Sequence, residues 1–196
     1  MRSPTGKVLS LFLLVAAQAC RTDDERLVRH VIIDVRDSSY GAAAAAFHMP
    51  STESKPDQER EREFVQRGLA ILHDEFGGFG EAEALAAEPK ALTVGIETGD
   101  AAYWQNKRDV KRRMYRVRFE RIGDGYLLVD LTSVTGKSEI RRVAYGISAD
   151  NGEQLIVLRR AAKRLSSLLD QLKEQPQPSK SVALSRTLAE ALSWHL

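Results

Sequence analysis

Three consecutive strand patterns between Met114 and Ser148 limit the possible folds of this chain more than any other feature. Apolar and polar residues alternate over residues 114–122, 126–134 and 139–148, as they do in strands with one buried face. The first two segments are joined by Gly123-Asp124-Gly125, which has the chemistry of a tight hairpin turn. Short connections of this kind join antiparallel neighbours. The sequence therefore predicts a three-stranded antiparallel meander.

Two further segments have the apolar spacing of amphipathic helices. The first begins at Ser54, a suitable N-cap, and runs to about Phe76, where Gly77-Gly78 ends it. The second follows the capping sequence Asp150 to Glu153 and continues to Leu172. Their predicted buried stripes are Val65, Leu69, Leu72 and Phe76 in the first helix, and Leu155, Leu158, Ala162, Leu165, Leu169 and Leu172 in the second.

The remaining elements are predicted from shorter patterns. Val28 to Val35 has the β-branched density of a buried strand, and Ala91 to Thr98 alternates as a half-buried strand does. Residues 41–49 are compatible with a short helix or with an extended segment that carries Phe47 inward, and residues 182–194 with a short amphipathic helix. Together these elements predict an α+β fold: a mostly antiparallel sheet of about five strands with two main helices packed on one face, plus a short C-terminal helix.

The N-terminal stretch from Lys7 to Cys20 predicts export. Arg2 and Lys7 form a positive region, an apolar run of ten residues follows, and Ala17-Gln18-Ala19 is a small-x-small cleavage site. An apolar run of this length reaches only about half of a bilayer core, so we interpret residues 1–19 as a signal peptide rather than a membrane span.

Cys20 is the only cysteine of the chain and directly follows this site. The sequence Ala17 to Cys20 resembles a bacterial lipobox, whose cysteine is acylated and becomes the mature N-terminus. Acylation would also remove an unpaired thiol from an oxidising compartment. The resemblance implies attachment to the periplasmic face of the outer membrane, because Arg21 follows the cysteine; a soluble periplasmic or secreted form is the alternative. The predicted organisation is a signal peptide (1–19), a lipidated tether (20–27), an α+β domain (28–173) and a linker with a C-terminal helix (174–196).

The formal charge of +2 belongs to the leader. Arg2 and Lys7 account for it, and the remaining chain has 27 basic and 27 acidic residues. This balance argues against a nucleic-acid partner. A hydrophobic content of 43% excludes disorder of the whole chain.

Motifs for catalysis, cofactors and metals are weak. Thr135-Gly136-Lys137-Ser138 ends like a phosphate-binding loop, but Leu131 occupies the position that requires glycine. The four histidines are scattered without ligand spacing, so no metal or other cofactor is predicted. Ser38 or Ser39 beside Asp37 could form a hydrolase site with a histidine, but no nucleophile elbow supports it. We therefore expect no catalytic residues, with a periplasmic hydrolase of an envelope component as the alternative.

Residues 107–121 are the most unusual stretch chemically, because they carry eight basic residues against two acids. With the cations at 159–164, they could form a surface for anionic lipid, lipopolysaccharide or an envelope protein. The alternative is a solvated sheet face on which the arginines pair with Glu97, Glu120 or Glu139. The candidate partner-binding residues are Tyr103, Trp104, Lys111, Arg112, Arg113, Arg116 and Arg118.

The chain also resembles a group of bacterial envelope lipoproteins of unknown function. The resemblance covers most of residues 28–172 and implies a lipid anchor on Cys20 and a small α+β domain, with no catalytic residues to transfer. It is carried by Cys20, Phe47-His48-Met49-Pro50, Gly77-Gly78-Phe79-Gly80, Leu92-Thr93-Val94-Gly95-Ile96 and Ser148-Ala149-Asp150.

Overall fold

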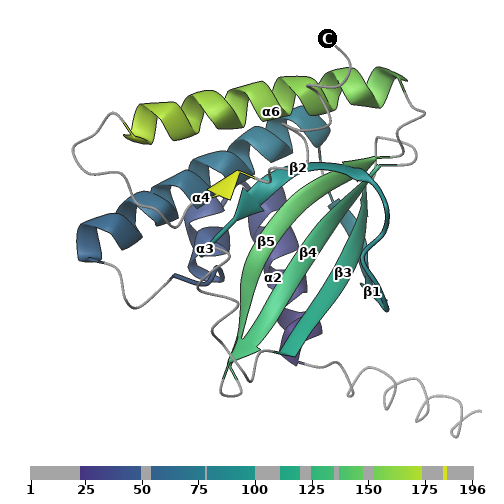
Figure 1. Ribbon diagram of the computed structural model, residues 1–196. Helices are drawn as coiled ribbons and strands as arrows, with labels where there is room; N and C mark the ends of the chain where they lie inside the picture. The colour runs from purple at the N-terminus through teal and green to yellow at the C-terminus, as the bar shows by residue number, and fades with distance from the viewer. Residues whose placement is uncertain are drawn as a thin grey trace, which may run out of the picture.

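The computed structural model confirms the predicted α+β class (Figure 1). It describes residues 23–49, 54–77, 79–99, 111–119, 125–134, 137–147, 152–173 and 183–184. The helices are α2 (Asp23–Arg36), α3 (Tyr40–Ala45), α4 (Lys55–Phe76) and α6 (Gly152–Lys173). The strands are β1 (Phe79–Leu85), β2 (Leu92–Glu97), β3 (Lys111–Phe119), β4 (Tyr126–Val134), β5 (Lys137–Ile147) and β6 (Ala183–Leu184).

The sheet is antiparallel, with the strand order β1-β3-β4-β5-β2-β6. The helices form a layer on one of its faces (Figure 1). Alternate residues of the strands point into this layer and are almost fully buried, as Val117, Val129, Val143 and Val94 show. No helix among the described residues is both long and apolar enough to cross a membrane.

The predicted meander is confirmed as β3, β4 and β5. β4 has the predicted bounds, and its residues pair with β3 from Lys111↔Ser133 to Arg118↔Tyr126. β5 begins two residues before the predicted start. The hairpin residues Gly123 and Asp124 lie outside the described residues. The alternating pattern predicted these strands correctly because successive side chains of a strand point to opposite faces, and one face packs on the core.

Both predicted helices are confirmed as α4 and α6. Ser54 caps α4, and its hydroxyl accepts a hydrogen bond from the Asp57 backbone N–H at 3.4 Å. Gly77 ends α4 at φ 81°, a positive value that glycine adopts without a steric penalty. The predicted apolar stripes face the core, while Asp150 and Asn151 lie outside the described residues.

The prediction of a strand at Val28–Val35 is wrong, because this segment belongs to α2. Val28, Val31, Ile32 and Val35 are buried, and their spacing is that of one helix face. β-branched residues favour strands only weakly, and packing of this stripe on the core outweighs that preference. Residues 23–27, expected as part of a tether, form the first turns of α2, where acids are favourable.

The structure resolves the open prediction for residues 41–49, and it differs from expectation at β1 and β6. Residues 40–45 form α3, and Phe47 then makes an isolated parallel bridge to Ile140, so a short helix and an extended segment both occur. β1 was not predicted. Ala183–Leu184 pairs with β2 as β6, where the sequence predicted the start of a helix. The rest of that predicted helix and the linker at 174–179 lie outside the described residues.

Candidate functional site: the polar face of the sheet

The sheet has a second face, turned away from the helices, on which polar side chains gather. On β4, Leu127, Val129 and Leu131 belong to the helix-covered face, and the residues between them belong to the other. We call this other face the polar face. Its polar residues are Glu83 on β1, Arg112, Arg116 and Arg118 on β3, Tyr126, Asp130 and Thr132 on β4, Arg142 on β5 and Thr93 and Glu97 on β2.

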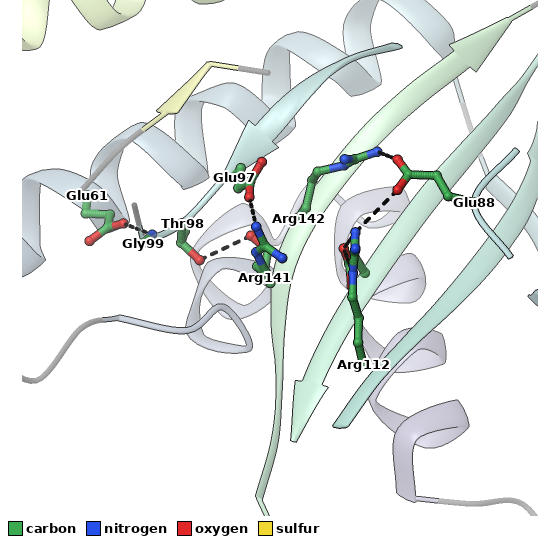
Figure 2. Close-up of polar contacts among 9 residues, drawn as sticks. Glu61, Glu88, Glu97, Thr98, Gly99, Arg112, Arg141 and Arg142 are labelled. Atoms are coloured by element: carbon green, nitrogen blue, oxygen red, sulfur yellow. Dashed lines mark hydrogen bonds and ion pairs between the residues drawn. The ribbon is translucent and has the colours of Figure 1, made fainter. Parts of the chain in front are cut away.

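Asp130 is the centre of an ion-pair network on this face. Its side chain is only 3% exposed, and both carboxylate oxygens accept from the Arg112 Nε at 3.0 and 2.8 Å. Arg112 also contacts Glu88, which in turn accepts from the Arg142 Nη2 at 2.7 Å (Figure 2). Glu88, from the β1–β2 connection, therefore bridges two arginines on β3 and β5.

The titration behaviour of the network follows from these contacts. The hydrogen bond to Asp130 raises the pKa of Arg112. Burial alone would raise the pKa of Glu88, but Arg142 and Arg112 outweigh burial and lower it. Both groups are consequently held in their charged forms.

Further pairs flank the network. Arg116 donates to Glu83 at 2.8 Å and lowers the pKa of that carboxyl, and its guanidinium lies 6.0 Å from the centroid of the Tyr126 ring. Arg141, beside the bulge in β5, pairs with Glu97. Apart from Arg118, the arginines of the face pair with acids, so the face is mostly a surface of paired charges rather than a cationic patch.

Four buried side-chain atoms on the polar face have no hydrogen-bond partner in the described structure. They are Nε of Arg116, Nε of Arg142, the hydroxyl of Tyr126 and the hydroxyl of Thr132. An arginine Nε can only donate, and both hydroxyls can donate as well. Burial raises the pKa of Tyr126, so its phenol stays protonated. The face therefore has unused donors, and a group rich in acceptor oxygens is the natural complement.

Two glycines, Gly146 and Gly95, allow close contacts on the polar face. A Cβ on Gly146 would lie 2.6 Å from the Tyr126 ring, so only glycine lets this ring lie across β5. A Cβ on Gly95 would lie 2.2 Å from the Val143 carbonyl oxygen, so β2 can approach β5 closely only at a glycine.

The far end of β2 is fixed by a buried carboxylate of α4. Glu61 is fully buried and accepts from the backbone N–H of Gly99 at 3.3 Å (Figure 2). The Thr98 hydroxyl donates to the Arg141 carbonyl at 3.2 Å. The first bond connects α4 to the end of β2, and the second connects the end of β2 to β5.

The structure separates the predicted partner-binding residues. Arg112, Arg116 and Arg118 lie on the polar face, whereas Arg113 lies on the opposite face and pairs with Asp24 of α2 at 2.5 Å. Lys111 and Arg118 are exposed and form no ion pair in the described part of the chain. Tyr103 and Trp104 lie outside the described residues.

The structure also differs from two other predictions about charge, which concern the cations of α6 and the acidic partners of the arginines. The cations of α6 belong to the helix layer and do not converge with those of the polar face. Of the acids expected as partners, Glu97 pairs with Arg141, Glu139 pairs with His48 and Lys137, and Glu120 lies outside the described residues. The arginines of β3 instead use Asp130, Glu83 and Asp24.

A second group of polar side chains involves the serine considered for catalysis. Ser38 has a positive φ of 58°, and the Tyr40 hydroxyl lies 3.4 Å from its Oγ and 2.8 Å from the His73 Nδ1. Tyr40 therefore stands between the serine and the imidazole. Within the described residues no group of three or more histidine, cysteine or acidic side chains could hold a metal ion.

Sequence reasoning missed the centre of the site. Asp130 is a lone acid in a strand that is otherwise largely apolar, and a nearly fully buried acid is rare unless it is paired. That signal could have singled it out. Glu88 carried no such signal, because its role depends on how the β1–β2 connection lies. Comparison with protein-family models, curated proteins and solved structures finds no match for this chain.

Proposed function

We propose that the protein is an exported, lipid-anchored and non-catalytic envelope protein that binds a partner rich in acceptor oxygens on the polar face. The observation that carries this proposal is the group of four buried polar atoms on one face of the sheet that have no partner among the described residues. A buried polar group without a partner costs about 1–3 kcal/mol, and such cost is commonly kept where it serves binding.

The contacts around these atoms favour a compact anionic group. Arg116 and Arg142 are already held by Glu83 and Glu88, so a ligand reaches their Nε donors once it displaces the side chains that cover them. Because most charges of the face are paired, long-range attraction of a polyanion is weak. A carboxylate or phosphate on an envelope component, or on a protein segment, fits this arrangement better than an extended polyanion.

The lipid anchor rests on the N-terminal sequence. The signal-peptide pattern and Cys20 support it, and α2 begins at Asp23, only three residues later. A domain that starts so close to its anchor would lie next to the membrane surface.

Binding can be tested with two probes, glycerol phosphate and glucuronate, titrated onto the protein while its thermal midpoint is followed. The double variant Tyr126→Phe/Thr132→Val removes only two hydroxyls, and Tyr40→Phe is the matched control in the helix layer. We expect at least one probe to raise the thermal midpoint of the native protein and of the control. The same probe should raise the midpoint of the double variant much less. Equal shifts in all three proteins, or none, would refute the polar face as the site.

The anchor can be tested by intact-mass analysis of the membrane-fraction protein, with Cys20→Ala as the control. We expect a native species that begins at Cys20 and carries acyl mass, and loss of this mass in the variant. A native species beginning at Cys20 without acyl mass would contradict the anchor while leaving the binding proposal intact.

A further inference from the structure

One stripe of α6 combines an exposed apolar residue with cations. Ile156 is 64% exposed and is the only strongly exposed large apolar side chain among the described residues. Arg159, Arg160 and Lys163 follow it at helical spacings of three, four and seven, so all four project from one side of the helix. We call these four residues the α6 stripe.

Two cations of the stripe have no acidic partner within the described ranges. Arg159 and Lys163 form no ion pair in the part of the chain that the structure describes, and both are exposed. Arg160, by contrast, donates to Glu75, which Arg164 also contacts at 2.7 Å. The stripe therefore has a positive excess at Arg159 and Lys163, next to the exposed Ile156.

A shallow groove lies along the flank of the stripe, between α4 and α6. Its volume is about 510 Å³, and its lining combines the exposed Lys163 and Ser167 with the half-buried Ile71 and the buried Leu168. Arg67 stands on the α4 side and donates to Gln171 at 3.1 Å. A lining of exposed donors and apolar side chains suits a phosphate headgroup with the first carbons of its chains.

We propose that the α6 stripe docks on a bilayer surface of anionic phospholipid headgroups. Ile156 enters the interface between headgroups, Arg159 and Lys163 contact the phosphates, and one headgroup occupies the groove beside Lys163. The charge complementarity favours this surface, because Arg159 and Lys163 are cations without acidic partners among the described residues and lie beside an exposed aliphatic side chain. The helix layer lies across the sheet from the polar face, so docking leaves the polar face accessible (Figure 1).

The test uses an environment-sensitive fluorophore on Ile156→Cys in the full chain carrying Cys20→Ala, so that the label has one attachment site. Lys90→Cys, exposed and far from α6 in sequence, is the control position. With vesicles of phosphatidylcholine containing phosphatidylglycerol, we expect a blue shift and quenching by spin-labelled lipid at position 156, and neither at position 90. Because the label reports contact at one residue, attachment elsewhere in the chain does not imitate this result.

Charge reversal then tests the cations. In the labelled protein, Arg159→Glu or Lys163→Glu should weaken partitioning onto the anionic vesicles roughly fivefold or more, whereas Lys90→Glu should not. No spectral change at position 156, an equal change with pure phosphatidylcholine, or equal weakening by Lys90→Glu would each overturn the proposal. Binding of soluble probes at the polar face is measured in a separate experiment. The docking proposal and the polar-face proposal can therefore be refuted independently.

Discussion

The two faces of the sheet bury side chains of different kinds, apolar on one face and charged or polar on the other. Towards the helices, β2 to β5 present aliphatic and aromatic side chains that need only shape and contact, such as Tyr145 stacked on Phe76 with ring centroids 3.7 Å apart. On the polar face, Asp130 is equally buried, yet it depends on directional hydrogen bonds from Arg112. The first arrangement stabilises the fold through contact area, whereas the second is stable only where every charge is matched.

This difference indicates what each face contributes. Apolar packing alone could hold a sheet of this size to its helices, so stability does not require a buried acid in the central strand. A buried ion pair is seldom more stabilising than apolar residues of similar volume. The buried ion pairs of the polar face are therefore not explained by stability alone. Four changes measure the contrast between the two faces.

The largest effect is expected in the apolar core. Phe76→Ala removes a ring that is 1% exposed and leaves a cavity beside Tyr145, so it should lower the free energy of unfolding by about 3–5 kcal/mol. Chemical denaturation measures this loss. Ile156→Ala, on the exposed side of α6, is the control and should change stability little. A loss below about 1 kcal/mol for Phe76→Ala would contradict the placement of this ring in the core.

Breaking the central ion pair should cost about 3 kcal/mol, because Arg112→Met leaves the Asp130 carboxylate buried without its main partner. Arg113→Met is matched in chemistry and position but should cost only about 1 kcal/mol, because the helix N-terminus still stabilises Asp24. Urea denaturation compares the two variants. Equal losses would mean that Asp130 is not specially dependent on Arg112.

Removing the Thr132 hydroxyl should stabilise the free protein. Thr132→Val keeps the shape of a side chain that is 2% exposed and relieves its unsatisfied hydroxyl, so we expect a gain of about 1 kcal/mol in the free energy of unfolding. Thr98→Val, whose hydroxyl donates to Arg141, should lose stability instead. Comparison of the two denaturation curves measures the difference. A loss at Thr132 would show that its hydroxyl is satisfied in solution.

The smallest effect concerns acid stability. The pKa of Glu88 is lower in the folded protein than its ordinary value of 4.5, so its stabilisation is complete above that value and is lost as the pH falls through the lowered pKa. Glu88→Gln should therefore reduce stability at neutral pH and make it fall less steeply below pH 4.5. Glu59→Gln, an exposed control on α4, should keep the native slope. Denaturation midpoints measured between neutral and acid pH test this prediction.

Periodicity predicted structure better than residue preference did. The alternation in the meander and the stripe of α4 indicated the right elements, because burial of one face fixes the spacing of apolar residues. The same rule applies to Val28, Val31, Ile32 and Val35, where β-branched preference led to a wrong strand. β1 was missed because alternating alanine and glutamate give little apolar signal at a sheet edge.

Local patterns were sufficient to predict the alternation in β3 to β5, the stripes of the two long helices and the cap of α4, because each depends on neighbours within a few residues. The predicted export signal with its single cysteine rests on the same kind of local evidence. The partners of Arg112 and Arg113, which are Asp130 and Asp24, and the reach of Glu88 to both Arg112 and Arg142 became visible only in the folded chain. These contacts join residues far apart in the sequence, and their geometry exists only once the strands have paired and the β1–β2 connection has taken its place.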